Sequence, residues 1–413
     1  MKIAMVTSSY YPFVGGFESA IQTLATELNR RGVHTDVLTF NMNKKWEPVC
    51  RWEIEKINGV NIIRIPALRS PTLNILKKKI DPLEKFWVHA IPQPSITRVL
   101  EDYNIIHFQG EFDLSFPLFS YFVKKPKILH CHGMYQAHVF YKKNILCNCL
   151  LRKFQYYICI SNELLELLLD LGINKEKISV IPNPINLEEF SAVTEMNDPL
   201  AYDESLNFNR NTKKIVYVSR LSSDKLIAIK STIKAVPKIV EEIPNAQIIL
   251  VGDGPYFSYV KTLTERINKQ LNRKAVIMTG AIKDPIGAGR MAKIMNLADV
   301  IIGIARVALE AMACGKPAII AGSVLGPLGG NFGGIVTKEN VTQLKDCNFS
   351  GRNSSERTTP DRIAEAVIEL LTNDKRRQKI GDFGRRFIEK EHDIQKVADK
   401  IEEVYHNTLE NYR

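Results

Sequence analysis

Short apolar runs alternate with segments of helical periodicity along almost the whole chain, and this alternation limits its fold more than any other feature. The first run, residues 2–6, is followed by Gly15-Gly16 and then by apolar residues at helical spacing up to Leu28. A second apolar run covers residues 33–40. Strands that alternate with helices in this way pair in parallel and are covered by the helices. The sequence therefore predicts an α/β protein built on parallel sheets.

The remaining apolar runs of strand length fall into two groups. The first group comprises residues 54–57, 60–65, 105–108, 128–130, 157–160 and 178–181, and the second comprises 214–219, 246–251, 275–279, 299–303 and 317–321. Within the first group, Asn58-Gly59 separates residues 54–57 from residues 60–65 and predicts a β-hairpin at the edge of the sheet. Two sheets of the same kind are therefore expected. After Thr359-Pro360 the chain is expected to be helical, over residues 363–371, 376–390 and 394–412.

The chain length of 413 residues agrees with two domains. Residues 1–185 form the expected first domain and residues 213–390 the second. Between them, residues 186–212 contain six acids, one base and no sustained periodicity, which is typical of a linker. Residues 391–413 form a last helix with an apolar stripe, which either crosses back onto the first domain or packs within the second.

Composition excludes several classes of protein. With 45% hydrophobic and 24% charged residues, the chain is a globular protein rather than a disordered or collagen-like one. Its seven cysteines include no C-x-x-C pair, so reduced thiols in a cytoplasmic setting are expected rather than disulfides or structural zinc. Residues 1–6 lead into polar residues without the pattern of a signal peptide, and no uncharged apolar stretch reaches membrane-spanning length.

The charge is distributed unevenly. The formal net charge is +11, and residues 114–162 contain seven lysines and arginines but no acid. This stretch is either an ordinary solvated basic face or a docking surface for anionic lipid headgroups or a phosphate-bearing substrate. Nucleic acid is not expected as a partner, because the chain has no zinc finger, helix-turn-helix spacing or aromatic RNA-binding signature.

Three loops that follow predicted strands carry candidate ligand-binding residues. In open parallel sheets ligands bind at the carboxyl ends of the strands. Gly15 and Gly16 precede the first helix, where small residues let a phosphate approach free backbone N–H groups, although a tight turn would need glycine equally. The dinucleotide pattern G-x-G-x-x-G is absent there, which argues against a dehydrogenase.

The other two loops belong to the second predicted sheet. Arg220 and Lys225 follow a strand and could neutralise a departing diphosphate, although each could equally lie in a solvated loop. Glu310 is the one acid in an apolar helix, and its carboxylate could accept both hydroxyls of a ribose. Arg306 precedes Glu310 by four residues, so a simple ion pair between the two is the alternative.

Five segments of the chain together resemble the retaining glycosyltransferases of glycosyltransferase family 4, the glycosyl transferases group 1. They are residues 10–18, 180–184, 220–225, 251–255 and 308–317. The resemblance implies the GT-B fold, an α/β architecture of two facing Rossmann-like parallel-sheet domains with a helical C-terminus. It also implies transfer of a sugar, with retention of configuration, from a nucleotide diphosphate sugar bound by the C-terminal domain to an acceptor held by the N-terminal domain.

The family pattern implies a role for each candidate residue. Glu310 would hold the ribose hydroxyls, Arg220 and Lys225 the diphosphate, and Gly16 would close over it. His132 stands where the family has a histidine near the sugar, and it would donate to a sugar hydroxyl or orient the acceptor. The resemblance implies no cofactor and no essential metal, so a metal site at His130, His132 and His138 is not expected.

One position departs from the family pattern. Eight residues before Glu310, where the family has a glutamate that touches the donor sugar, this chain has Ile302. Either backbone N–H groups and Arg306 bind the donor sugar instead, or turnover has been lost. The intact phosphate-binding residues and Glu310 favour the first interpretation. Ser219 and Pro184 replace two glycines of the family, which are milder changes.

Two classes of function follow from the sequence. The first is an active hexosyltransferase at the inner face of the membrane, which uses a nucleotide diphosphate sugar and a lipid-linked or polysaccharide acceptor in surface glycan biosynthesis. The second is a GT-B-fold protein that binds nucleotide sugar or glycan without catalysing transfer. The expected partners are the donor, the acceptor and an anionic membrane surface.

Overall fold

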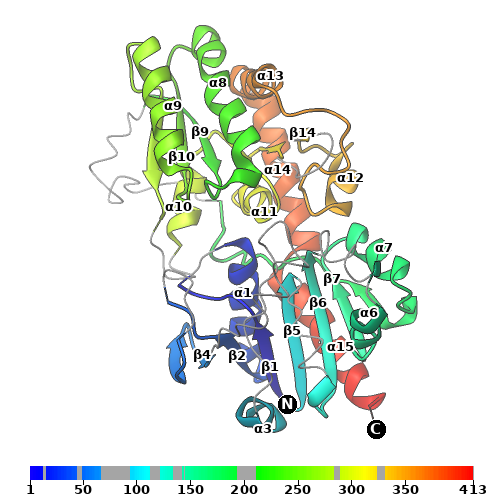
Figure 1. Ribbon diagram of the computed structural model, residues 1–413. Coiled ribbons are helices and arrows are strands. Elements are labelled where there is room, and N and C mark those ends of the chain that lie inside the picture. Colours follow the sequence, from blue (N-terminus) through cyan, green and yellow to red (C-terminus); the bar gives the residue numbers. More distant parts are fainter. Residues whose placement is uncertain are drawn as a thin grey trace. The chain divides into compact units, whose positions relative to one another are not determined.

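The computed structural model describes residues 1–12, 15–43, 49–66, 94–111, 121–133, 142–143, 145–192, 211–282, 289–322 and 331–412. The chain forms two compact units. The first consists of Met1–Pro184 together with Ile394–Arg413, and the second of Ile185–Asp393. Each unit is a sheet with helices on both faces (Figure 1).

The described part of the first unit contains an eight-stranded sheet of order β3-β4-β2-β1-β5-β6-β7-β8. Its strands are β1 (Lys2–Thr7), β2 (His34–Phe40), β3 (Glu53–Ile57), β4 (Val60–Ile65), β5 (Ile105–Glu111), β6 (Lys127–Gly133), β7 (Tyr156–Cys159) and β8 (Ile178–Val180). All pairs are parallel except the β3–β4 hairpin at the edge, as predicted from Asn58-Gly59. The strand order reverses between β1 and β5, which makes this the point where a ligand can enter between the loops.

The first unit buries one face of its sheet beneath two helices from opposite ends of the chain. Its helices are α1 (Gly16–Arg30), α3 (Pro94–Glu101), α6 (Ile145–Leu151), α7 (Asn162–Asp170), the 3₁₀ turn η1 (Lys175–Lys177) and α15 (Ile394–Glu410). The apolar stripe of α15, which includes Val397 and Ile401, lies in one core cluster with Ile3 of β1 and Ile21 of α1. The described residues include no helix that is long and apolar enough to cross a membrane.

Charged contacts fix α15 beside α1. Arg31, directly after α1, donates to the Asp399 carboxylate at 2.5 Å and to the Glu402 carboxylate at 3.0 Å. Burial alone would raise the pKa of Glu27, but its hydrogen bonds with Arg30 and Arg31 outweigh this and lower it. The last helix of the chain is therefore a structural part of the first unit.

The described part of the second unit contains a six-stranded sheet of order β11-β10-β9-β12-β13-β14. Its strands are β9 (Lys213–Val218), β10 (Ala246–Val251), β11 (Val276–Gly280), β12 (Val300–Gly303), β13 (Ala318–Ala321) and β14 (Phe332–Ile335). Its helices are η4 (Ser223–Lys225), α8 (Leu226–Glu242), α9 (Phe257–Gln270), α10 (Arg290–Leu297), α11 (Arg306–Ala313), α12 (Val341–Asp346), α13 (Pro360–Thr372) and α14 (Asp374–Glu391).

The second sheet differs from the sequence prediction at one edge. Strand β14 is antiparallel to β13, whereas only the five parallel strands were predicted. Its sequence contains Gly333-Gly334, and glycine has a low preference for strands, so the segment carries no strand signal. Of the predicted linker, residues 193–210 lie outside the described residues, and Phe190 is buried in the core of the second unit.

Candidate functional site

The candidate residues of the first unit lie at the carboxyl ends of three neighbouring strands. The β1 strand leads through its loop to Gly15 and Gly16, β5 carries Gln109 near its end, and β6 carries His132 near its end. Parallel pairing brings these ends to one edge of the sheet. The reversal of strand order between β1 and β5 lies at the same place.

The two glycines begin the first helix. Gly15 is the N-cap residue, with φ −149° and ψ 177°, an extended conformation that any residue can adopt. Both glycines are exposed, and Glu18 lies in the first turn of the helix. The turn itself therefore does not require glycine at position 15.

His132 lies beside this helix start. Its ring packs edge-on against Phe17, the residue after Gly16, with 4.9 Å between ring centroids. The Nε2 atom of His132 lies 2.8 Å from Oε1 of the buried Gln109. Burial lowers the pKa of His132 to about 3, although a hydrogen bond with Asn183 partly opposes this change. The imidazole is therefore neutral at pH 7.

A metal site at His130, His132 and His138 was considered from the sequence and not expected. His138 lies outside the described residues. Within the part of the chain that the structure describes, no group of three or more potential ligands could hold a metal ion.

In the second unit, the loop that carries Arg220 is locked by the loop after the neighbouring strand. The Leu221 amide donates to the Asp253 carbonyl at 2.8 Å, and the Tyr256 amide donates to the Leu221 carbonyl at 3.0 Å. Gly252 has φ 147°, and a Cβ there would lie 1.8 Å from the Ser219 carbonyl oxygen. Only glycine permits so close an approach, so the G-D-G sequence after β10 determines where the Arg220 loop lies.

Arg220 and Lys225 differ in their surroundings. The Arg220 side chain is exposed, and in the described part of the chain its guanidinium makes no hydrogen bond or ion pair with another side chain. Lys225 Nζ lies 3.2 Å from the Asp224 carboxylate. Burial tends to raise the pKa of Asp224, but Lys225 and the Ser222 hydroxyl outweigh this and hold it below its usual value.

Glu310 and Arg306 form a buried pair on α11, which follows β12, a neighbour of β9 in the sheet. Arg306 Nε donates to Glu310 Oε1 at 2.8 Å, and the two side chains are 7% and 10% exposed. Burial raises the pKa of Glu310 to about 7, although Arg306 partly opposes this. Strands β9 and β12, which precede these two loops, are neighbours at the point where the order of the second sheet reverses.

The structure places Ile302 inside the protein. Its side chain is fully buried in a core cluster of the second unit, and β12 continues past it to Gly303. Ala305 then adopts φ 51° and ψ −125°, and its amide donates to the Phe349 carbonyl at 3.0 Å. Only two residues separate the end of β12 from the start of α11, so the turn is short, as the sequence suggested.

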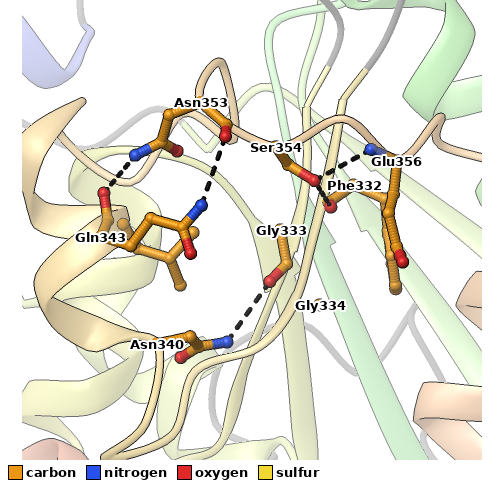
Figure 2. A pocket seen from close by; sticks show the side chains of 9 residues that line it. Phe332, Gly333, Gly334, Asn340, Gln343, Asn353, Ser354 and Glu356 are labelled. Atoms are coloured by element: carbon orange, nitrogen blue, oxygen red, sulfur yellow. Dashed lines mark hydrogen bonds between the residues drawn. The ribbon is translucent and has the colours of Figure 1, made fainter.

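A cavity of about 140 Å³ lies elsewhere in the second unit, between β14, α12 and the segment before α13 (Figure 2). Its polar groups bind one another: Asn340 Nδ2 donates to the Gly333 carbonyl at 3.5 Å, and Ser354 Oγ donates to the Phe332 carbonyl at 2.7 Å. None of the residues proposed from the sequence lines this cavity.

Within each unit the structure groups the proposed residues. Gly15, Gly16 and His132 lie together in the first unit, and Arg306 and Glu310 lie together in the second. Sequence reasoning missed Gln109, the hydrogen-bond partner of His132. Polar residues at alternate positions near the ends of two neighbouring apolar strands were the signal that could have identified it.

Two family models match almost the whole chain. Residues 14–189 match Glycosyltransferase Family 4, and residues 200–387 match Glycosyl transferases group 1. An uncharacterized glycosyltransferase of Methanocaldococcus jannaschii is 26% identical over 99% of both chains. The alpha-monoglucosyldiacylglycerol synthase of Streptococcus pneumoniae is 27% identical over 78% of this chain and 71% of its own.

Solved structures agree on the fold. The HepE protein of Anabaena, crystallised with UDP, has 18% identity and a TM-score of 0.67, over 98% of this chain and 100% of that one. Two sheets of mainly parallel strands, a helical C-terminus and this similarity define the GT-B fold predicted from the sequence. The chain therefore belongs to glycosyltransferase family 4 and is a glycosyltransferase.

Proposed function

We propose that this protein is a retaining glycosyltransferase that moves a hexose from a nucleotide diphosphate sugar to a lipid-linked or polysaccharide acceptor in surface glycan biosynthesis. The observation that carries the proposal lies in the second unit. An exposed guanidinium, Arg220, and a buried carboxyl group, Glu310, follow the two strands between which the strand order reverses. This combination suits a ligand that is anionic at one end and carries vicinal hydroxyls at the other.

Each residue of the second unit takes a distinct part. Glu310 accepts hydrogen bonds from the ribose hydroxyls, and Arg220 binds the diphosphate through two of its N–H groups. Lys225 adds a second positive charge as the leaving group departs. Arg306 and the backbone N–H groups at the start of α11 contact the donor sugar in place of the glutamate that Ile302 replaces. This division is consistent with the pairing of Lys225 with Asp224, since Arg220 is then the stronger ligand.

The first unit contributes the acceptor side and two further donor-binding residues. Gly15 and Gly16 leave the N-terminus of α1 open to the donor phosphates, and the extended backbone at Gly15 supports this role because no turn demands glycine there. His132 lies beside this helix start and contacts the sugar or the acceptor. Relatives support a lipid or glycan acceptor. One is the alpha-monoglucosyldiacylglycerol synthase of S. pneumoniae, and another is the GDP-mannose-dependent monoacylated alpha-(1-6)-phosphatidylinositol monomannoside mannosyltransferase of Corynebacterium glutamicum.

An anionic membrane surface is the proposed site of action. Tyr121 and Phe122 are 65% and 54% exposed and precede the exposed Lys124, in the acid-free stretch of the sequence. Ile145, 82% exposed, lies in the same stretch beside two exposed lysines. Exposed apolar side chains with lysines around them are the chemistry of an interfacial membrane contact.

Nucleotide binding is the first test. Calorimetric titration with UDP, GDP and ADP should give one preferred nucleotide, whose affinity falls in Arg220→Ala and in Glu310→Ala. Arg266→Ala, which removes an exposed arginine on α9, is the matched control and should bind like wild type. If no nucleotide binds, or if the control loses as much affinity as the two variants, the proposed donor site is wrong.

Turnover and stereochemistry are tested next. The sugar conjugates of the preferred nucleotide are incubated with diacylglycerol, phosphatidylinositol or a polyprenyl diphosphate sugar, and the product anomer is read by NMR. If the enzyme is retaining, the transferred sugar in the product has the same anomeric configuration as in the donor. An inverted product would refute the retaining mechanism.

Sedimentation with vesicles tests the membrane contact. Vesicles with about a third anionic phosphatidylglycerol should sediment with wild type. They should bind the Tyr121→Ser/Phe122→Ser double variant much more weakly, since burial of each aromatic ring in the membrane contributes a few kcal/mol. Tyr259→Ser, at a 46% exposed tyrosine of the second unit, is the control. Equal sedimentation of all three proteins would exclude these aromatic residues from a membrane contact.

A further inference from the structure

Three stacked histidines lie in the first unit, and two of them have no part in the proposed function. The rings of His107 and His130 have centroids 5.3 Å apart, and those of His130 and His132 are 4.3 Å apart. His107 and His130 are buried, and neither ring nitrogen of His130 has a hydrogen-bond partner in the described part of the chain. Gln109, 1% exposed, lies two residues after His107 on β5.

The hydrogen bonds around Gln109 fix where the protons lie. Its Oε1 is 2.8 Å from His132 Nε2, and an amide oxygen only accepts, so His132 Nε2 carries the proton. Its Nε2 is 3.2 Å from His107 Nε2 and 3.4 Å from His107 Nδ1. Because Nδ1 already lies 2.7 Å from the Tyr405 hydroxyl and an amide nitrogen only donates, the amide donates to Nε2, which is then unprotonated. Burial lowers the pKa of both histidines to about 3, so each ring is neutral and holds a single proton.

The last helix closes this chain of hydrogen bonds. Because His107 Nε2 accepts, its proton is on Nδ1, which lies 2.7 Å from the hydroxyl oxygen of Tyr405 on α15. Tyr405 is fully buried, and its ring packs edge-on against His107. The donors therefore run in one direction: His132 to Gln109, Gln109 to His107, and His107 to Tyr405.

We propose that Gln109 is a positioning residue that holds His132 in the Nε2–H tautomer, and that His107 and Tyr405 hold the Gln109 amide in the orientation this requires. His132 then has Nδ1 as its acceptor atom. It meets Asn183, with which it hydrogen-bonds, or a ligand hydroxyl by accepting a hydrogen bond, whereas the family pattern implied that His132 donates to a sugar hydroxyl or orients the acceptor. The tautomer follows from the contacts of the first unit alone, and only the identity of the ligand rests on the proposed function.

The tautomer can be measured without substrate. Long-range ¹H–¹⁵N spectra of the full chain labelled at histidine distinguish Nε2–H from Nδ1–H, and His132→Asn identifies the His132 signals. Wild type is expected as Nε2–H. In Gln109→Met the Nδ1–H population should rise about tenfold, which is the equilibrium worth of one lost hydrogen bond. A wild-type Nδ1–H tautomer, or an unchanged tautomer in Gln109→Met, would overturn the proposal.

Two further variants separate positioning from general damage. Gln247→Met removes a buried glutamine of β10 in the second unit, whose amide donates to the Lys274 carbonyl at 3.0 Å, and should leave the His132 signals unchanged. Tyr405→Phe removes only the acceptor for His107. The Gln109 amide can then reverse, so the His132 Nδ1–H population should rise even if Gln109→Met does not fold. If Gln109→Met does not fold and Tyr405→Phe keeps the wild-type tautomer, the proposal fails.

Kinetics test what the tautomer does. Release of nucleotide diphosphate from UDP-glucose, UDP-galactose or GDP-mannose should show kcat lowered about 10- to 100-fold in Gln109→Met, with the donor KM nearly unchanged. Gln109→Glu keeps an acceptor oxygen and should recover part of the loss. An unchanged kcat in Gln109→Met would refute the positioning role. If wild type holds the predicted tautomer but consumes no donor, the proposed function fails and the tautomer assignment stands.

Discussion

Replacing Glu310 with glutamine is expected to remove a pH dependence from the stability of the second unit. The Glu310 side chain is 10% exposed, and burial raises its pKa from the ordinary 4.5 to about 7 in spite of Arg306. The folded chain therefore holds this proton more tightly than the unfolded chain does. Stability from this group is complete below pH 4.5 and is lost as the pH rises to about 7.

The size of the effect follows from the two pKa values. A difference of one in pKa corresponds to about 1.4 kcal/mol. Between pH 5 and pH 8, ionisation of Glu310 should therefore lower the free energy of unfolding of wild type by about 2 to 3 kcal/mol, relative to the glutamine variant. The glutamine amide oxygen can still accept a hydrogen bond from Arg306, and arginine stays charged over the whole range, so in the variant this contact contributes a constant amount at every pH.

Urea unfolding of wild type and Glu310→Gln at pH 5, 6, 7 and 8, followed by circular dichroism, measures the difference. Glu27→Gln is the matched control, because hydrogen bonds from arginines lower the pKa of this buried glutamate, and its contribution is therefore lost as the pH falls. The contribution of Glu27 is lost only below about pH 4.5, so from pH 5 to pH 8 the Glu27→Gln difference should stay nearly constant, while the Glu310→Gln difference changes by about 2 to 3 kcal/mol. A Glu310→Gln difference that is constant, or that increasingly favours wild type as the pH rises, would show that Arg306 keeps Glu310 ionised and would refute the reasoning.

Three other outcomes can be checked directly. Arg220→Ala should weaken nucleotide binding about 10- to 100-fold, and Lys225→Ala should weaken it less, since Lys225 already pairs with Asp224. Calorimetry with the preferred nucleotide would contradict this if Lys225→Ala lost more affinity than Arg220→Ala. Truncation after Lys390 should lower the melting temperature sharply, because α15 closes one core cluster of the first unit; an unchanged melting temperature would refute this. Burial lowers the pKa of the fully buried His107 to about 3, so the unfolded chain takes up a proton below pH 6.5 that the folded chain does not. At pH 4 this should lower the free energy of unfolding by about 3 kcal/mol. Urea unfolding of His107→Leu should lack this loss of stability at low pH.

The fold was predictable from the sequence wherever a strand is apolar on both faces. Strands β1 and β10 lie inside parallel sheets, so most of their residues are apolar and form visible runs. Strand β14 pairs at an edge and contains Gly333-Gly334, so its conformation depends on pairing with β13 rather than on its own residues. Such a strand has no local signal.

The site was predictable only in part, for a similar reason. Arg220 lies two residues after β9, and Glu310 lies on the helix that follows β12, so the loops and helix that carry them could be identified from the sequence. The alternating polar residues of β5 and β6 indicate which side chains share a face, but the pairing of His132 with Gln109 and of His107 with Tyr405 depends on register and on distant packing. Gln109 stands opposite His130 in the pairing of β5 with β6, and Tyr405 reaches His107 across 298 positions of sequence.

The isoleucine at position 302 and the arginine at position 306 are explained by a single feature, the short turn between β12 and α11. Ile302 is inside the strand with its side chain in the core, so a carboxylate there would be buried among apolar groups and would cost several kcal/mol. The same short turn places Arg306 at the first position of α11, buried beside Glu310. Ile302→Glu is therefore expected to destabilise the second unit by several kcal/mol without restoring a contact to the donor sugar, as thermal unfolding and donor consumption would show. Ile302→Val, which keeps an apolar side chain, is the control, and a stable Ile302→Glu variant with higher turnover would mean that position 302 reaches the donor after all.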